Sequence, residues 1–219
     1  MNKRINDKIT KKRGVKMTNQ YFEKNPSSEH NQQEITLSFQ DQSMFFLTDS
    51  GTFSKNRVDY GSRVLLESFC KHISNEQSQN ILDLGSGYGP IAITLGKIYT
   101  KSKVIGVEIN ERAYLLAQDN AKRNQTDNVK FILNDACNYV SSTRFDDVVT
   151  NPPIRAGKEI IQTFVEVAYQ HLNSKGRLWV VIQKKQGAPS MQKHMQFIFG
   201  NVEKVQQDKG YWILLSYKK

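Results

Sequence analysis

The sequence has few of the features that mark membrane-spanning, secreted or metal-binding proteins. Its longest fully apolar runs are a handful of residues, such as LWVVI at 178–182, and no apolar signal-peptide core follows the basic start. Its two cysteines, Cys70 and Cys137, lie far apart, which favours reduced thiols in a cytoplasmic protein. The four histidines share no ligand-like spacing with each other or with the cysteines, so we expect neither a membrane partner nor a metal site.

Positive charge is concentrated at the start of the chain. The formal net charge is +10, of which residues 1–16 carry +6 through seven Lys or Arg and one Asp. This polar, basic and aperiodic segment is expected to be disordered. It is either an RNA-binding arm or a consequence of start-site choice, with Met17 as the alternative initiator. The mildly basic remainder permits a nucleic-acid partner without requiring one.

Strands and helices are expected to alternate from residue 80 onward. Apolar runs predict strands at 80–84, 103–108, 129–133, 145–150, 176–183, 202–207 and 211–217. Helical spacing predicts helices at 90–100, 110–124, 158–172 and 188–199, with Pro90 in a first turn and Asn110 as an N-cap. The alternation predicts an α/β fold: a Rossmann-like, doubly wound, mostly parallel sheet that ends in an antiparallel strand pair.

Residues 17–79 follow a different pattern. EITLSF and SMFFLT are expected as two strands joined by QDQ, GTFSKNRVDYGS as a loop, and RVLLESFCKHI at 63–73 as a helix. This is small for a second domain, so we expect an N-terminal extension packed on the sheet. The expected organisation is a disordered tail at 1–16, the extension at 17–79 and one domain at 80–219.

Polar segments follow four of the expected strands, at the edge of the sheet where parallel α/β folds bind ligands. The first is DLGSGYG, in which Gly85, Gly87 and Gly89 lie between a strand and a helix and allow a ligand to approach the backbone. The spacing differs from the G-x-G-x-x-G of a dinucleotide-binding loop. Asp83 would discourage a pyrophosphate and suit an ammonium group. A bare glycine turn and a dinucleotide-dependent oxidoreductase are the alternatives.

Carboxylates end the next two strands. Glu108 can accept from both hydroxyls of a ribose through charge-assisted hydrogen bonds. In the segment NDA, Asp135 can accept from the exocyclic amine of adenine, while the backbone of Asn134 and Ala136 can contact the edge of the ring. An exposed acid and a simple Asn-Asp turn are the structural alternatives.

The fourth segment is NPPI at 151–154, where prolines end a strand because proline cannot donate to the ladder. The order DLGSGYG, Glu108, NDA, NPPI resembles class I S-adenosylmethionine-dependent methyltransferases over roughly residues 80–217. In that family the Asn-Pro-Pro motif marks methyl transfer to a nitrogen, often an exocyclic amine. The segments GTFSKNRVDYGSRVLLE and NPPIRAGK further resemble the bacterial guanine-N2 methyltransferases of small-subunit ribosomal RNA.

The resemblance implies a methyltransferase domain, S-adenosylmethionine as cofactor, and a monomer that acts on 16S ribosomal RNA, free or in the small subunit. It implies a catalytic segment formed by Asn151, Pro152, Pro153 and Ile154. It also implies cofactor contacts from Asp83, Gly85, Ser86, Gly87, Gly89, Glu108, Ile109, Asn134, Asp135, Ala136 and Asn151, with Asp59, Gly61 and Ser62 closing over the methionine end. Some members carry a duplicate domain before the catalytic one, for which we expect no room in this chain.

Positioning dominates the chemistry that these residues imply. The exocyclic nitrogen of guanine is a poor nucleophile because its lone pair is delocalised into the ring. The Asn151 side-chain oxygen and the Pro152 carbonyl can accept its two N–H bonds and turn the lone pair toward the methyl group. Pro153 stiffens this loop. The target base must lie outside any stack, and neither a metal nor a strong base is required.

Four further residues are expected near the RNA. Arg155 and Lys158 can contact phosphates, although solvated charges are the alternative, and Phe53 and Tyr60 can line the target pocket or pack in the core. Relatives that act on DNA adenine or protein glutamine usually have an aromatic residue where this chain has Ile154, so those targets are the less favoured alternatives. A non-catalytic module that binds the cofactor and RNA is the last alternative.

Overall fold

The structure, a computed structural model, describes residues 29–219, so the expected basic tail at 1–16 lies outside the described residues. Its strands are β1 (Gln33–Phe39), β2 (Gln42–Thr48), β3 (Asn80–Leu84), β4 (Lys103–Glu108), β5 (Val129–Leu133), β6 (Phe145–Thr150), β7 (Leu172–Gln183), β8 (Glu203–Asp208) and β9 (Tyr211–Tyr217). Its α-helices are α1 (Tyr60–His72), α2 (Pro90–Ile98), α3 (Glu111–Arg123), α4 (Lys158–His171) and α5 (Ala188–Phe199). Short 3-10 helices follow three of the strands: η2 (Ala136–Asn138), η3 (Ile154–Ala156) and η4 (Lys184–Gln186). No helix between residues 29 and 219 has the length and hydrophobicity needed to span a bilayer.

Seven of the described strands form one sheet in the order β5-β4-β3-β6-β7-β9-β8. β3 pairs in parallel with both β4 and β6, and β9 pairs antiparallel to β7 and β8. From β3 the chain moves outward to β4 and β5 and then returns to β6, which places the topological switch point between β3 and β6. The predicted doubly wound, mostly parallel sheet with an antiparallel C-terminal pair is therefore confirmed.

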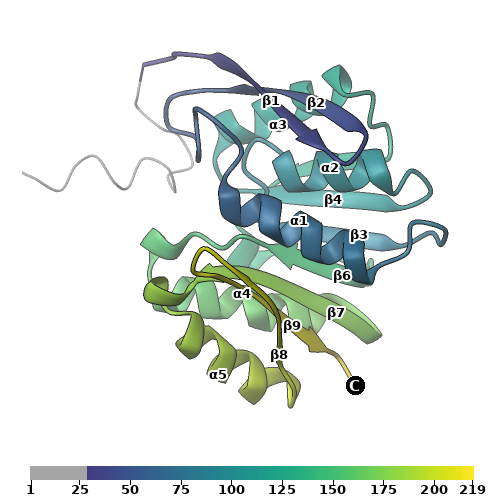
Figure 1. Cartoon of the computed structure of the whole chain (residues 1–219), viewed down its shortest axis with the longest axis vertical. Helices are drawn as coiled ribbons and strands as arrows, with labels where there is room; N and C mark the ends of the chain where they lie inside the picture. Colours follow the sequence, from purple (N-terminus) through teal and green to yellow (C-terminus); the bar gives the residue numbers. More distant parts are fainter. Residues whose placement is uncertain (1–28) are drawn as a thin grey trace, which may run out of the picture.

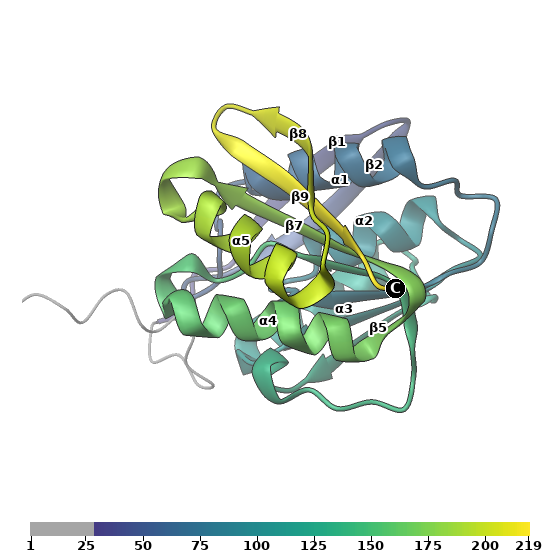
Figure 2. The same cartoon turned by 90° about the horizontal axis from the view of Figure 1, so that it is seen from below.

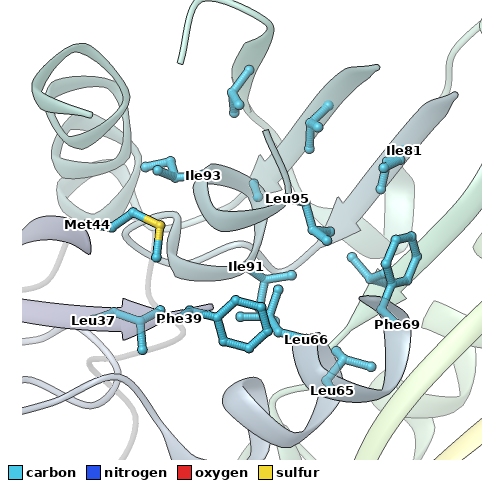
Figure 3. Packing of buried hydrophobic residues seen from close by; sticks show 14 of the residues in the cluster. Leu37, Phe39, Met44, Leu65, Leu66, Phe69, Ile81, Ile91, Ile93 and Leu95 are labelled. Atoms are coloured by element: carbon cyan, nitrogen blue, oxygen red, sulfur yellow. The ribbon is translucent and has the colours of Figure 1, made fainter. Parts of the chain in front are cut away.

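Helices cover both faces of this sheet. α1, α2 and α3 lie on one face together with the β1–β2 hairpin, and α4 and α5 lie on the other (Figures 1 and 2). Because successive strand residues point to opposite faces, Ile81 belongs to the core beneath α1 and α2, whereas Leu82 belongs to the core beneath α4 and α5. Figure 3 shows the first core, where Leu37 of β1, Leu66 of α1 and Ile91 of α2 meet.

Two asparagines, Asn120 of α3 and Asn124 at its C-cap, bind the free edge of β2. Asn120, which is fully buried, accepts from the Leu47 N–H at 2.7 Å and donates to the Leu47 carbonyl at 3.0 Å and the Tyr88 carbonyl at 2.9 Å. One turn later, Asn124 accepts from the Phe45 N–H at 3.0 Å and donates to the Phe45 carbonyl at 2.7 Å. The two amides thus pair with alternate residues of β2 as a neighbouring strand would, and they satisfy its edge.

Two boundaries differ from the expectation by three or more residues. α1 begins at Tyr60 rather than at residue 63, because the Asp59 side chain caps the helix by accepting from the Ser62 N–H at 3.2 Å. The segment GTFSKNRVDYGS is therefore a loop only as far as Asp59. β7 begins at Leu172 rather than at residue 176, and its first residue pairs with Phe145 ahead of a register shift.

Asn120→Ala should destabilise the protein strongly, because it leaves the half-buried Leu47 N–H and two carbonyls without their partner. We expect a loss of about 2–3 kcal/mol in the free energy of unfolding. In a domain of this size, that corresponds to a fall of roughly 5–10 °C in melting temperature, measured by thermal unfolding. Asp119→Ala is the matched control, because this exposed neighbour makes only a weak ion pair with Lys122 at 3.8 Å. Equal shifts in the two variants would contradict the bridging role of Asn120.

Candidate active site

A pocket of about 260 Å³ lies at the topological switch point, against the carboxyl ends of β3, β4, β5 and β6 and the start of α4. Backbone, carboxylate, amide and apolar side-chain groups meet there. Its lining residues are Gly85, Val107, Glu108, Ile109, Asp135, Ala136, Cys137, Asn151, Pro153, Ala156, Ile160 and Phe164. Each of the four strand ends therefore contributes at least one sequence-predicted residue to one cavity, whereas the lining does not include Asp83, Ser86, Gly87, Gly89, Asn134, Pro152 or Ile154.

The glycine loop after β3 folds back on the end of β4. The Gly85 and Ser86 N–H groups both donate to the Val107 carbonyl, at 2.9 and 3.0 Å. Gly85 has a φ of +76°, and a Cβ there would lie 3.2 Å from the Phe164 ring. Glycine is favoured at this position because other residues rarely adopt this φ, and a Cβ would also require the Phe164 ring to shift by a few tenths of an ångström. Gly89 then caps α2, which begins at Pro90 as expected.

Two backbone N–H groups, one in the glycine loop and one just after β4, hold the Glu108 side chain. Its carboxylate accepts from the Gly87 N–H and the Asn110 N–H, each at 2.8 Å. Burial raises the pKa of the Glu108 carboxyl, and the N–H donors oppose that rise. Each oxygen has a lone pair left for a further donor, such as a ribose hydroxyl in the pocket.

Asp83 is fully buried on the face of the sheet covered by α1 and α2. One carboxylate oxygen accepts from the Ala92 N–H at 3.2 Å, and the other has no hydrogen-bond partner among the described residues. Burial, with the nearby Glu108 charge adding to it, raises the pKa of Asp83 from 3.8 to about 8. The buried Ser86 hydroxyl also has no described partner. Both atoms are suited to a polar ligand that the chain itself does not supply.

At the end of β5, the segment NDA is a capped turn that faces the pocket with two of its three residues. Asp135 accepts from the Cys137 N–H at 2.9 Å and from the Asn138 amide at 2.7 Å. Asp135 thereby caps the start of η2. Asp135 and Ala136 line the pocket. Asn134 is exposed and donates its N–H to the Glu108 carbonyl at 2.9 Å, so the structure brings it to the site only through its backbone.

Asn151 points from the end of β6 toward the start of α1. Its amide nitrogen lies 3.0 Å from Asp59 Oδ2 and 3.0 Å from Ser62 Oγ. Ser62, expected near the methionine end of the cofactor, thus contacts Asn151. Its neighbour Gly61 packs beneath Tyr211, where a Cβ would lie 2.7 Å from the ring. These contacts place the start of α1 beside Asn151, and the closure of Asp59, Gly61 and Ser62 over the methionine end of the cofactor stays a prediction.

The four residues expected near RNA lie around rather than inside the pocket. Tyr60 begins α1, donates its hydroxyl to Asp208 and carries the Lys209 ammonium 4.6 Å above its ring. Phe53 is partly exposed in the loop before α1. Arg155 and Lys158 are exposed in η3 and at the first turn of α4.

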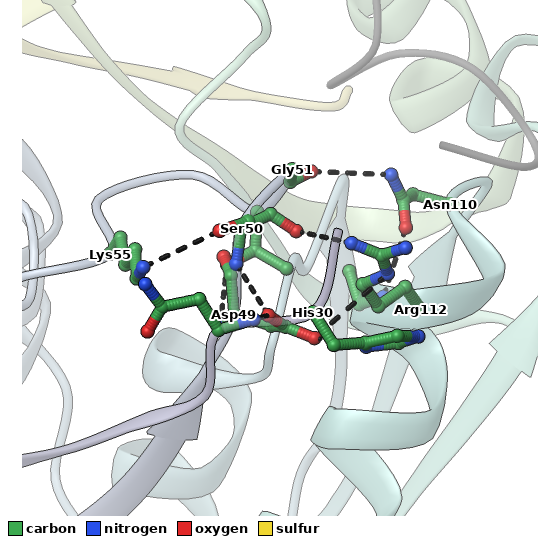
Figure 4. Close-up of polar contacts among 10 residues, drawn as sticks. His30, Asp49, Ser50, Gly51, Lys55, Asn110 and Arg112 are labelled. Atoms are coloured by element: carbon green, nitrogen blue, oxygen red, sulfur yellow. Dashed lines mark hydrogen bonds and ion pairs between the residues drawn. The ribbon is translucent and has the colours of Figure 1, made fainter. Parts of the chain in front are cut away.

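The loop after β2 is fixed to the residues that follow Glu108. The buried Asp49 carboxylate binds His30 at 2.6 Å and lies 3.9 Å from Arg112, whose guanidinium donates to the Ser50 carbonyl at 2.7 Å (Figure 4). Asn110, the N-cap of α3, donates to the Gly51 carbonyl at 3.4 Å. The N-terminal extension therefore helps to hold the turn that carries Glu108.

The family is decided by the match of residues 43–215 to the model of the methyltransferase small domain. The chain belongs to this family. It is 40% identical over 203 residues to YbxB, an uncharacterized protein of Bacillus subtilis, covering 92% of this chain and 100% of that one. It is 30% identical over 137 residues to the ribosomal RNA small subunit methyltransferase C of Erwinia tasmaniensis, covering 60% of this chain and 38% of that one.

A solved structure gives the same fold. The 16S rRNA N2 G1207 methyltransferase of T. thermophilus, in complex with AdoMet and guanosine, superposes with a TM-score of 0.78 at 25% identity. The match covers 86% of this chain and 51% of that one, so the chain spans about half of that enzyme and less of the Erwinia relative. This methyltransferase small domain is thus a class I S-adenosylmethionine-dependent methyltransferase, which removes the dinucleotide oxidoreductase alternative.

The pocket fits S-adenosylmethionine, and we propose a role for each part of it. The unpartnered Asp83 oxygen suits the ammonium group of the methionine, directly or through water. Glu108 suits the ribose hydroxyls, and the apolar side chains of Ile109, Ala136 and Ile160 suit the adenine ring. A ring of three or more His, Cys, Asp or Glu side chains able to hold a metal does not occur within residues 29–219.

Several residues of the site were not expected from the sequence. Phe164 and Ile160 come from α4, and their helical spacing is that of an ordinary amphipathic helix, so nothing in the sequence distinguishes them from core residues. Val107 and Cys137 adjoin expected site residues and could have been found by extending each motif by one position. No local sequence pattern predicts the hydrogen bond between Asp59 and Asn151, because these residues are 92 positions apart.

Glu108→Ala should weaken cofactor binding far more than it slows methyl transfer at saturating cofactor. Ribose hydroxyls do not change during the reaction, so contacts to them are equally strong in the ground and transition states. We expect a rise in the S-adenosylmethionine Kd of about 10- to 100-fold, measured by calorimetry. Glu111→Ala, which removes an exposed acid three residues further on, is the control. Lost turnover at saturation with unchanged affinity would contradict the ribose role.

Asp83→Asn should change the pH dependence of stability in the ligand-free protein. The folded carboxyl has a raised pKa of about 8, so the folded state keeps a proton that the unfolded chain has lost. The stability that this proton contributes is complete below about pH 4 and is lost as the pH rises toward 8. Relative to the variant, the melting temperature of the wild type should therefore fall between pH 5 and pH 8. A constant difference across this range would show that Asp83 is already ionised.

Proposed function

We propose that this chain transfers the methyl group of S-adenosylmethionine to the exocyclic N2 amine of a guanine in 16S ribosomal RNA. The observation that carries the proposal is the orientation of Asn151 beside the cofactor pocket. Its amide nitrogen is engaged by Asp59 and Ser62, which leaves its oxygen to accept from a target amine. The similar T. thermophilus enzyme is a guanine-N2 methyltransferase of 16S rRNA and was solved with guanosine bound, which supports guanine as the base.

The proposed chemistry rests on how Asn151 and Pro152 hold the amine. When bound, the cofactor supplies an electrophilic methyl group on sulfur. The Asn151 oxygen and the Pro152 carbonyl accept the two N–H bonds of the amine, which turns the nitrogen lone pair out of conjugation and toward the methyl group. Pro152 and Pro153 follow β6 after Asn151 alone, so the backbone carbonyl is held by a stiff segment. Fixing the amine in this geometry provides most of the rate enhancement.

Basic side chains in the segments at this edge of the sheet support an RNA substrate. They are the exposed Arg57, Arg155, Lys158, Lys184, Lys185 and Lys209 and the half-buried Lys55. The Lys184 N–H donates to the Gly210 carbonyl at 2.8 Å, which places η4 beside the β8–β9 turn, and Lys209 covers the ring of Tyr60. Clustered lysine and arginine side chains attract the phosphate backbone irrespective of base sequence.

Ile154 argues for guanine over the alternative targets. Its side chain packs against the core beneath α4 and α5, so no aromatic ring follows the two prolines at the mouth of the pocket. The aromatic residue expected of enzymes that act on adenine N6 or protein glutamine is therefore replaced by an aliphatic one. The proposed guanine must be extruded from any stack, or already single-stranded, to reach Asn151.

The proposal is tested by methyl transfer to ribosomal RNA from a strain that lacks the gene. Purified protein and S-adenosylmethionine with a tritiated methyl group are incubated with naked 16S RNA and with small ribosomal subunits, and the labelled nucleosides are separated. We expect label in N2-methylguanosine. Label in N6-methyladenosine or in protein would replace the proposed target. Absence of label in both substrates, with cofactor binding intact, would favour the non-catalytic module.

Asn151→Ala should abolish most of this activity while it leaves the fold and the cofactor affinity nearly unchanged. The prolines keep the backbone in place, and only one of the two acceptors for the amine is lost. Removing a preorganised polar contact of this kind typically lowers turnover by a factor on the order of a hundred to a thousand. Turnover close to that of the wild type would show that Asn151 is only the end of a strand.

A further inference from the structure

The start of α1 supplies the groups that hold the Asn151 amide. Asp59 precedes the helix by one residue, and its Oδ2 atom receives two donors: the Ser62 N–H at 3.2 Å and the Asn151 amide nitrogen at 3.0 Å. The Ser62 hydroxyl lies 3.0 Å from the same nitrogen. One carboxylate therefore caps the helix and contacts the residue proposed to bind the substrate.

An asparagine amide has two ends of nearly equal shape, so sterics alone do not determine which end faces a ligand. A carboxylate accepts hydrogen bonds and donates none when ionised, so only the nitrogen end of Asn151 can face Asp59 favourably. We infer that Asp59 is a positioning residue, which selects the amide orientation that presents the Asn151 oxygen to the target amine. This inference rests on the proposed function, because it assumes that the Asn151 oxygen accepts from that amine.

The position of Asp59 is itself closely constrained. A Cβ on Gly61 would lie 2.8 Å from Asp59 Oδ2 and 2.7 Å from the Tyr211 ring, so glycine leaves the space that the carboxylate occupies. Tyr60 binds Asp208 at the end of β8, which ties the start of α1 to the far edge of the sheet. The Asp59 oxygen is thus placed by the helix it caps and by the strands beside it, and not by Asn151 alone.

The position of Asp59 also affects the activity expected of Asn151→Asp. A carboxylate at this position would keep an acceptor for the amine, which by itself favours partial activity. In the folded protein, however, one of its oxygens would face the Asp59 carboxylate with no hydrogen between them. Two carboxylates that meet where the amide nitrogen now lies 3.0 Å from Asp59 Oδ2 would repel each other. We therefore expect Asn151→Asp to be no more active than Asn151→Ala.

The test is a double-mutant cycle between Asp59 and Asn151, measured with 16S RNA and small subunits from the deletion strain. Asp59→Gly removes the acceptor and keeps the helix start, because glycine is a tolerated N-cap. We expect kcat to fall by roughly 10- to 100-fold, with KM and Kd for S-adenosylmethionine within about two-fold. Asp59→Asn should recover most of the loss, because the Ser62 N–H draws the new amide oxygen into the place of Oδ2. Ser62→Ala, which removes only the second acceptor, should cause a smaller loss.

The decisive comparison is the variant that carries both Asp59→Gly and Asn151→Ala. If Asp59 acts through Asn151, this double variant should be no slower than Asn151→Ala alone. A multiplicative loss, or full activity of Asp59→Gly beside an inactive Asn151→Ala, would overturn the inference and leave the proposed function intact. An active Asn151→Ala would instead overturn the proposed function.

A second readout needs no substrate. The side-chain amide protons of Asn151 can be observed by nuclear magnetic resonance and assigned by their disappearance in Asn151→Ala. In the wild type their hydrogen bonds to Asp59 and Ser62 should slow exchange with solvent. Asp59→Gly should speed that exchange and shift the resonances. Unchanged resonances in Asp59→Gly would show that Asp59 does not hold the amide.

Discussion

The parallel pairing of β3 with both β4 and β6 is the constraint on which the remaining structure depends. It aligns the carboxyl ends of strands that leave the switch point in opposite directions, and it opens the cavity between them. Glu108 and Asn151 lie at or just beyond the ends of their strands, so the aligned strand ends bring both to the pocket, whereas Asp83 lies one residue before the end of β3 and does not line it. The alternation of strand side chains then directs Asp83 toward α1 and α2, away from the core beneath α4 and α5.

Burial of two carboxylates at neighbouring strand ends is unfavourable in the ligand-free protein. Backbone N–H groups offset part of the desolvation: two donate to Glu108 and one donates to Asp83. The other Asp83 oxygen has no partner among the described residues, so no hydrogen bond offsets its desolvation. Burial raises the pKa of Asp83 to about 8. We propose that the ammonium group of the cofactor relieves this cost when it binds.

The N-terminal extension and the sheet form one site rather than two independent units. Asn120 and Asn124 attach β2 to α3, and the Asp49 cluster attaches the following loop to the turn after Glu108. Asp59 then brings the start of α1 to Asn151. The chain spans 38% of the Erwinia relative and 51% of the T. thermophilus enzyme, whereas YbxB is covered entirely. The residues proposed for catalysis and for cofactor binding all lie within residues 43–215, which match the family model.

Local patterns in the sequence determined the order of strands and helices, because burial repeats every second or every third to fourth residue wherever an element packs on a core. They also pointed to Asp83, the glycine loop, Glu108 and Asn151 as candidate site residues, since each lies at or next to the end of an apolar strand, and their roles stay predictions. The two largest boundary errors, at the starts of α1 and β7, arose because an N-cap and an irregular pairing override composition. Only the tertiary structure decided which end of the Asn151 amide faces the start of α1. That choice depends on Asp59, 92 residues earlier in the chain, and no local pattern records a contact made by folding.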